Sequence, residues 1–277
     1  MPVPLRGIFG GERVEPDRAQ ATAEHLFRWR TDKRPMTRLA AELCPADEGD
    51  AYQIQSLLHE KLTAHGLGPV SGHKIGCTTP VMQAYLGIGQ PCAGGIFAHS
   101  VQGPLATVRA ADYVRLGVEC EIAVLLKSDI SPESAPYDRR SVGLFVDGVT
   151  AAMELVDDRY DDFSDFGVAS LIADDFFNTG CVLGAPVTDW QNLDLAAITG
   201  AMWIDEAEIG RGSGADIMGH PLEALAWIAN LWAQRGLTLR AGSFVMLGSV
   251  VQTQWLEAGN RVRISIDGLG EATLRVE

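Results

Sequence analysis

The first 70 residues have the hydrophobic spacing of helices rather than of strands. Residues 17–30 are rich in Ala, Glu and Arg and predict a helix, which the proline-containing residues 31–36 interrupt. A second helix is predicted over 47–65 and ends at the glycines and proline of 66–69. Its apolar residues form one stripe, at Ala51, Ile54, Leu58 and Leu62. We expect residues 1–70 to form a small helical N-terminal region that packs on the rest of the chain.

From residue 71 onward, short β-like runs and frequent glycines replace the helical spacing. Strands are predicted at 117–126, 151–156, 181–183, 201–204, 243–247, 261–266 and 272–276. Helices are predicted at 80–86, 139–149, 168–173 and 220–235. Strands and helices do not alternate regularly, which favours an α+β domain on a curled mixed sheet over a doubly wound one. The expected division is a helical region, 1–70, and a larger α+β domain, 71–277.

Composition and charge narrow the function mainly by exclusion. The chain has 277 residues, of which 47% are hydrophobic, so it can bury a large core and is not a disordered protein. Its 22 basic and 36 acidic residues give a net charge of −14. This charge repels phosphate backbones, so we expect no nucleic-acid partner. A small anionic substrate would need a local source of positive charge.

The cysteine pattern and the absence of targeting signals predict a cytoplasmic protein. The five cysteines are widely spaced and include no C-x-x-C pair, which favours reduced thiols over a disulfide framework or a zinc site. The N-terminus lacks the apolar run of a secretory signal. No uncharged apolar run approaches the ~20 residues that span a bilayer, so no membrane partner is expected.

Two glutamates share one face of the strand predicted at 117–126. Alternate strand residues point to the same side, so Glu119 and Glu121 lie on the face that continues with Ala123 and Leu125. Two like charges on a partly buried face repel each other and lose hydration. A divalent cation between the two carboxylates would remove this penalty.

A third carboxylate, Glu154, is alone in the apolar run 151–156 and needs a cation or a hydrogen-bond partner. Ligation by oxygen atoms alone favours Mg²⁺ or Mn²⁺, with positions left open for water or substrate. The alternative hypothesis is structural: Glu119 and Glu121 face water on an edge strand, and Glu154 pairs with an arginine such as Arg159.

Residues 71–78 offer a candidate positive charge. His73 and Lys74 are adjacent in an extended segment, so they point to opposite faces and only one can face a given site. Lys74 would bind an anionic substrate or act as an acid or base, whereas a surface lysine is the structural alternative. The glycine-rich segment 210–214 fits no nucleotide-binding motif and is predicted to be a flexible loop.

Several segments together resemble the 2-keto-4-pentenoate hydratases of the fumarylacetoacetate hydrolase superfamily. The run GHKIGCTTPVMQAYLGIGQP is similar to the start of their catalytic domain, VECEIAVLL to their E-x-E metal strand, and AAMELVDDRY to the strand of the third carboxylate. FFNTGCVLG, GHPLEALAWIANLWAQRGLTLRAGSFVMLGS and GNRVRISIDGLGEATLRV come next in the same order. The resemblance covers essentially residue 71 to the C-terminus.

This resemblance implies a mixed sheet curled into an incomplete barrel, usually in a homo-oligomer. It also implies Mg²⁺ or Mn²⁺ held by Glu119, Glu121 and Glu154. The metal would chelate the carboxylate and the 2-oxygen of a small anionic 2-oxo or 2-hydroxydienoic acid, and would stabilise its enolate. Water then adds at C4 to give a 4-hydroxy-2-oxo acid, a hydratase reaction of aromatic-compound catabolism.

The resemblance also assigns roles to other residues. Lys74 matches the lysine of the family's G-x-K-I-G motif and would assist proton transfer or hold the substrate carboxylate. Asn178 and Ser249 match polar positions near the site and are candidate substrate contacts. Many of these hydratases have Q-P-D-F-G where this chain has Cys92 in place of the aspartate, and a thiol does not simply replace a carboxylate base.

Three alternative functions stay open at this point. A 2-oxo-3-enedioate decarboxylase would use the same chelation but lose CO₂, and an acylpyruvate hydrolase would cleave a C–C bond on the same metal site. A non-catalytic partner subunit would keep only the fold.

Overall fold

The computed structural model describes residues 15–277. The α-helices are α1 (Pro16–Asp32), α2 (Glu48–Leu62), α3 (Pro80–Leu86), α4 (Arg139–Gly143), α5 (Val168–Ala173) and α6 (Pro221–Gln234). The first six strands are β1 (Val70–Gly76), β2 (Cys92–Phe97), β3 (Val101–Gln102), β4 (Leu105–Val108), β5 (Leu116–Leu126) and β6 (Val146–Asp157). The others are β7 (Asn178–Leu183), β8 (Thr199–Ile204), β9 (Ala207–Ser213), β10 (Phe244–Trp255), β11 (Arg261–Ile266) and β12 (Gly270–Val276).

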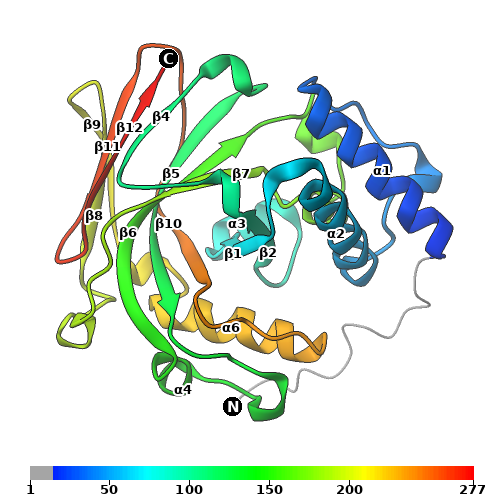
Figure 1. The fold of residues 1–277 in the computed structure, drawn as a ribbon. Helices are drawn as coiled ribbons and strands as arrows, with labels where there is room; N and C mark the ends of the chain where they lie inside the picture. The colour runs from blue at the N-terminus through cyan, green and yellow to red at the C-terminus, as the bar shows by residue number, and fades with distance from the viewer. Residues whose placement is uncertain (1–14) are drawn as a thin grey trace.

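The strands form two sheets. The seven-stranded sheet has the order β2-β1-β10-β5-β6-β7-β3, and the five-stranded sheet has the order β4-β12-β11-β8-β9. The pairs β1–β10, β3–β7 and β4–β12 are parallel and the others antiparallel, so both sheets are mixed. The long strands β5, β6 and β10 curve through the middle of the molecule (Figure 1). The predicted α+β class with a curled mixed sheet is therefore confirmed.

The N-terminal helices pack on the large sheet's side of the molecule, opposite the five-stranded sheet (Figure 1). In α2, the predicted apolar stripe is buried, and Asp47 caps the helix by accepting a hydrogen bond from the backbone N–H of Asp50. Leu26 of α1, Leu58 of α2 and Ile75 of β1 belong to one buried cluster. The helices therefore share their core with the sheet, as expected for so short a segment.

Two sequence predictions were wrong. The helix predicted at 139–149 ends at Gly143, and β6 begins at Val146. Val146 and Val149 are fully buried in pairing with β5, and β-branched residues favour this strand. The segment 210–214 is not a flexible loop, because residues up to Ser213 pair with β8. The strands β2, β3, β4 and β9 were not predicted, since short or glycine-containing runs lack a clear alternation.

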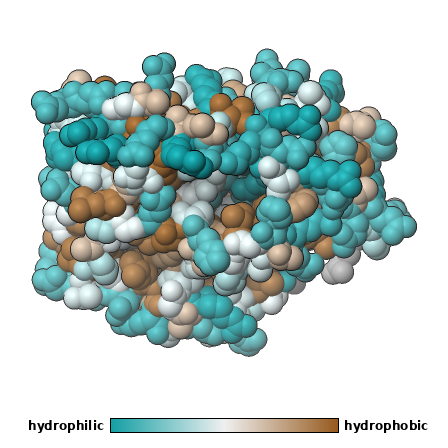
Figure 2. Space-filling model, turned by 45° about the horizontal axis from the view of Figure 1, so that its top comes forward, coloured by the Kyte–Doolittle hydropathy of each residue, from teal (hydrophilic) through white to brown (hydrophobic). Residues whose placement is uncertain are grey.

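Hydrophilic residues cover much of the face shown in Figure 2, with hydrophobic patches between them. Within residues 15–277, the helices are too short or too polar to cross a bilayer.

Gly214 directly follows β9 and packs against the backbone of the loop that precedes β8. A Cβ atom at Gly214 would lie 1.8 Å from the backbone oxygen of Leu195, which cannot move like a side-chain end. Gly103 provides a matched control because it is exposed and a Cβ there would meet nothing within 4 Å.

We predict that Gly214→Ala lowers the melting temperature by about 5 °C or more, through roughly 2 kcal/mol of overpacking. Gly103→Ala should leave the melting temperature within about 1 °C, as expected for a surface position. Differential scanning calorimetry measures both. Equal melting temperatures for the two variants would show that the segment 210–214 is free to move after all.

Candidate metal centre and active-site cleft

Three glutamates gather on neighbouring strands of the large sheet. Glu119 and Glu121 alternate along β5, and Glu154 of β6 is the cross-strand partner of Glu119. One carboxylate oxygen from each lies within 4.8 Å of the other two. The β-strand period brings Glu119 and Glu121 to one face, whereas the β5–β6 register brings in Glu154.

Burial and mutual repulsion make this cluster unfavourable without a cation. Burial and the neighbouring Glu154 charge raise the pKa of Glu119 to about 7. Burial, Glu154 and Glu119 together raise the pKa of Glu121 well above its ordinary value. Glu121 is 1% exposed, and its Oε1 has no hydrogen-bond partner. An oxygen-ligated divalent cation fits this donor set, because it supplies both the missing charge and the missing partner.

The structural alternative for these glutamates is wrong. β5 is not an edge strand, because β10 and β6 pair with it on either side. Arg159 does not pair with Glu154: its Nη2 lies 2.8 Å from Oδ2 of Asp174. Glu154 pairs instead with Lys74, whose Nζ lies 3.1 Å from Glu154 Oε1.

Each glutamate is held by one further group. The backbone N–H of Gly248 donates to Glu121 Oε2 at 3.0 Å, the Thr253 hydroxyl donates to Glu119, and the Asn178 amide donates to Glu154 at 2.9 Å. Gly248 lies at an irregularity of β10 with φ 129°, and a Cβ atom there would meet Thr78 at 2.7 Å. Only glycine suits this position.

Lys74 brings positive charge to the cluster. It is 3% exposed and lies on β1, with its Nζ 5.4 Å from the centre of the Phe176 ring. Burial alone would lower the pKa of Lys74, but the surrounding carboxylates, Glu154 foremost, raise it above the ordinary value. His73 points to the other face, as predicted, and its ring packs edge-on against Trp232 at 5.0 Å.

A cleft of about 1110 Å³ opens beside Lys74 and Glu119. Its walls come from β1, α3, the segment after α5 and the second half of β10, and most of them are apolar. Among the described residues, 15–277, the acidic residues that line the cleft are Glu119, Asp158 and Asp216. The one cationic residue in this lining is Lys74.

The two weaker candidates occupy different surroundings. Ser249 lies in the cleft wall, and its hydroxyl faces the backbone oxygens of Cys120 and Val251, at 3.1 and 2.5 Å. Asn178 is 1% exposed and contacts Glu154 rather than the cleft lining. Its position is that of a residue that orients Glu154. A substrate contact by either residue stays a prediction.

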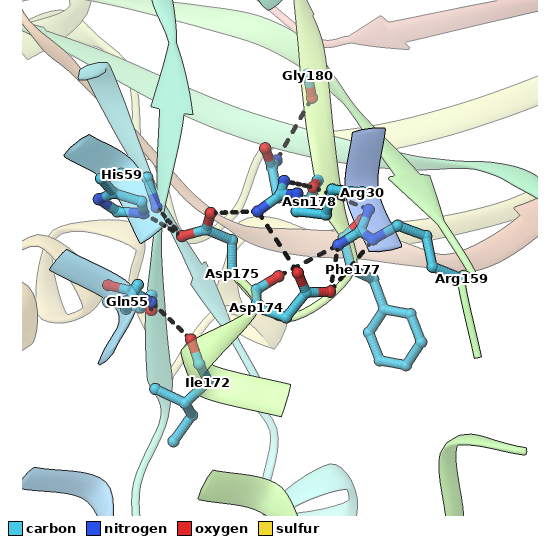
Figure 3. A network of polar contacts seen from close by, with 12 residues as sticks. Arg30, Gln55, His59, Arg159, Ile172, Asp174, Asp175, Phe177, Asn178 and Gly180 are labelled. Carbon is cyan, nitrogen blue, oxygen red and sulfur yellow. Dashed lines mark hydrogen bonds and ion pairs between the residues drawn. The ribbon is translucent and has the colours of Figure 1, made fainter. Parts of the chain in front are cut away.

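A buried polar network holds the segment that carries Asn178 (Figure 3). Asp175, Phe176 and Phe177 have positive φ angles of 58°, 48° and 68°, a conformation that costs free energy for residues other than glycine. Arg30 and His59 contact the Asp175 carboxylate at 2.8 and 2.6 Å.

The second half of the network is an arginine pair. Arg159 donates to the Asp174 carboxylate and to the backbone oxygens of Phe177 and Asn178, and Arg30 also donates to Asn178 O, at 3.0 Å. These contacts keep the left-handed turn in place (Figure 3). Because of this turn, Phe176 and Phe177 line the cleft, and the Asn178 amide reaches Glu154.

Sequence reasoning missed most of this support. Thr253, Arg30 and His59 gave no local signal, because each reaches the site from a distant part of the chain. The pair Asp174–Asp175 preceding the matched run FFNTG was the one available hint, since two adjacent acids before an apolar segment require partners.

The curled mixed sheet and the buried carboxylate triad beside a cleft define an α+β protein with a candidate divalent-cation site. The chain belongs to the fumarylacetoacetate hydrolase family, whose C-terminal domain model matches residues 95–277. Within it, the chain is 32% identical to the 2-keto-4-pentenoate hydratase of Paraburkholderia phymatum, over 92% of this chain and 96% of that protein. It is 26% identical to the 4-oxalocrotonate decarboxylase of Pseudomonas putida, over 92% and 95% of the two chains.

A solved structure gives the same fold. The 4-oxalocrotonate decarboxylase of Pseudomonas putida G7, complexed with magnesium and adipate, superposes with a TM-score of 0.89 at 24% identity. The match covers 96% of this chain and all of that one, so the helical region is included.

We predict that Asp175→Asn lowers the free energy of unfolding at pH 7 by about 3 kcal/mol, because it breaks a buried ion pair. Burial opposes ionisation, but His59 and Arg30 hold the pKa of Asp175 well below its ordinary value. The stabilisation is therefore complete above the unfolded pKa near ~3.9 and declines as the pH falls below it. Urea unfolding at several pH values measures the gap between wild type and variant.

The exposed pair Arg240–Asp129 provides the control for this measurement. Asp129→Asn should change the unfolding free energy by less than about 1 kcal/mol. A gap for Asp175→Asn that widens toward acid pH would contradict the assignment.

Proposed function

We propose that this protein is a divalent-metal-dependent hydratase, a hydro-lyase that adds water to a 2-hydroxy-2,4-dienoate through its 2-oxo tautomer. The product is a 4-hydroxy-2-oxo acid. The observation that carries the proposal is the conjunction of a largely buried three-glutamate cluster with similarity to 2-keto-4-pentenoate hydratases along nearly the whole chain. A relative from Comamonas testosteroni named 2-hydroxyhexa-2,4-dienoate hydratase is 32% identical over 82% of this chain.

Glu119, Glu121 and Glu154 would hold Mg²⁺ or Mn²⁺, since the donor set is entirely carboxylate oxygen. When bound, such a cation polarises the carboxylate and 2-oxo oxygens of the substrate as a Lewis acid. Gly248, Thr253 and Asn178 fix the three carboxylates from outside.

Lys74 would act on the substrate rather than on the metal. Its ammonium group is held at the wall of the cleft by Glu154 and lies over Phe176, so it can contact a substrate carboxylate or exchange a proton with the carbon skeleton. The apolar walls exclude bulk water and strengthen these electrostatic contacts.

Decarboxylation is the second candidate, because decarboxylases also occur among the relatives. The cleft argues against it. The distal carboxylate of a dicarboxylate would need a cation away from the metal, but Lys74, the one cation of the described lining, lies 3.1 Å from Glu154 at the metal end. Asp158 and Asp216 of the lining would repel that distal carboxylate. Arg115 is exposed and does not belong to the lining: its guanidinium lies over the Trp255 ring and 3.4 Å from Asp158. A monocarboxylic substrate with an apolar tail fits this lining best.

The remaining expectations are part of the proposal. We infer a role in the catabolism of aromatic compounds, a homo-oligomer and a cytoplasmic location, and a division into a helical region, 1–70, and a catalytic domain, 71–277.

We predict that Mg²⁺ or Mn²⁺ stabilises the folded protein and so raises its melting temperature. At a metal concentration a hundredfold above the dissociation constant, binding adds about 3 kcal/mol to the free energy of unfolding. Glu121→Gln should abolish this increase. Its metal-free melting temperature should equal or exceed that of the wild type, because the substitution removes a repelling charge.

The exposed Glu257 provides the control: Glu257→Gln should keep the full metal response. A metal response that persists in Glu121→Gln would rule out the assigned ligands. Isothermal titration calorimetry with either ion checks the same point without heating.

We predict that turnover with Mg²⁺ favours 2-hydroxypenta-2,4-dienoate over 2-oxo-3-hexenedioate by about 10- to 100-fold in kcat/KM, since the second carboxylate of the diacid is left unpaired. Product analysis should give 4-hydroxy-2-oxopentanoate. Release of CO₂ from the diacid without hydration of the monoacid would establish the decarboxylase instead.

A further inference from the structure

Two cysteine thiols meet at the wall of the cleft. The Sγ atoms of Cys77 and Cys92 are 4.0 Å apart, and both cysteines are free. Cys77 directly follows β1, and Cys92 begins β2, where it pairs with Gly76. The antiparallel β1–β2 register therefore sets the two thiols side by side, although 14 residues separate them in the sequence.

The two thiols differ in access. Cys77 lines the cleft and is half-buried, whereas Cys92 is 1% exposed and lies behind it. A Cβ atom at the intervening Gly76 would lie 3.3 Å from Cys92 Sγ and 3.4 Å from Lys74 Nζ, so the ammonium group is close to the pair. An accessible thiol beside a cation and a second thiol is the usual environment of an oxidation-sensitive cysteine.

The electrostatics divide the roles between the thiols. The hydrogen bond from the Cys92 thiol and the charge of Lys74 lower the pKa of Cys77, against the opposing effect of its burial. Burial, followed by the hydrogen bond to Cys77, raises the pKa of Cys92. Cys77 is thus the thiol that is oxidised first, and Cys92 is the resolving thiol that then forms the disulfide with it.

We propose that Cys77 and Cys92 form a reversible oxidation site, at which a peroxide converts the two thiols into a disulfide. The Cys77 sulfur attacks a peroxide oxygen: an S–O bond forms, the O–O bond breaks, and the leaving hydroxide takes up the thiol proton as water. The Cys92 sulfur then attacks Cys77: the S–S bond forms, the S–O bond breaks, and a second water leaves with the Cys92 proton. Two thiols lose two electrons, and hydrogen peroxide gains them.

Bond formation requires the sulfur atoms to approach by about 2 Å, because a disulfide is ~2.05 Å long. Cys92 is fixed in a buried strand, so the movement falls on Cys77. Cys77 has φ 58°, its oxygen accepts from the Gln83 side chain of α3 at 2.9 Å, and α3 has no buried residue. Because Cys77 lines the cleft and contacts α3 through Gln83, we expect the disulfide to alter this part of the cleft wall, which couples the thiol state to the active site.

The test treats the purified, reduced full-length protein with hydrogen peroxide, blocks free thiols with N-ethylmaleimide and maps the peptides by mass spectrometry. We expect a Cys77–Cys92 disulfide within one chain, reversed by dithiothreitol. Cys92→Ser should leave a Cys77 sulfenic acid that dimedone traps, and Cys77→Ser should form neither product. Cys44→Ser changes another half-buried thiol, away from the pair, and should keep the wild-type response.

This readout counts thiols, so it does not depend on the proposed hydratase activity. Wild-type protein that keeps Cys77 and Cys92 reduced, or links either of them to another cysteine, would overturn the proposal. In a parallel assay, the oxidised protein should lose about tenfold or more of its metal-dependent turnover and regain it with dithiothreitol, because small displacements at a site are costly. Unchanged turnover of the disulfide form would overturn the coupling to the cleft.

Discussion

The mutual repulsion of three closely spaced carboxylates, two of them buried, is the constraint on which the rest of the site depends. Glu119, Glu121 and Glu154 lie on two adjacent central strands. Glu121 and Glu154 are each 1% exposed, so water cannot solvate them well, and Glu119 is half-buried at the cleft. Within the protein, Lys74 offsets one of these charges, and three hydrogen-bond donors hold the carboxylates in place. A divalent cation at the proposed metal centre would complete the balance of charge.

The need to hold these carboxylates in place also links the N-terminal helices to the large sheet. Glu154 is oriented by Asn178, which follows a left-handed turn that would not persist without support. The support comes from Arg30 of α1 and His59 of α2, together with Arg159 after β6. The N-terminal helices thus support the glutamate cluster through the network in Figure 3 as well as through the shared hydrophobic core. A family match that begins at residue 95 does not reveal this dependence.

Much of the fold was predictable where the hydrophobic period was long and regular. The stripe of α2, the helix predicted at 220–235 and the shared face of Glu119 and Glu121 on β5 all appear in the structure as the sequence indicated. The prediction was wrong at 139–149, where a short helix turns into a strand, since local propensity does not register pairing with β5. Glycine-containing strands such as β9 were not predicted, because small residues do not produce an alternating hydrophobic pattern.

For the site, the sequence by itself determined that two glutamates share a strand face, that a third is isolated among apolar residues, and that His73 and Lys74 point apart. These facts follow from the two-residue period of a strand, which needs no tertiary information. Only the tertiary structure decided that Glu154 lies opposite Glu119, that Lys74 reaches Glu154, and that Cys77 meets Cys92. Strand order and register set these contacts, and both are fixed by packing between segments far apart in the chain.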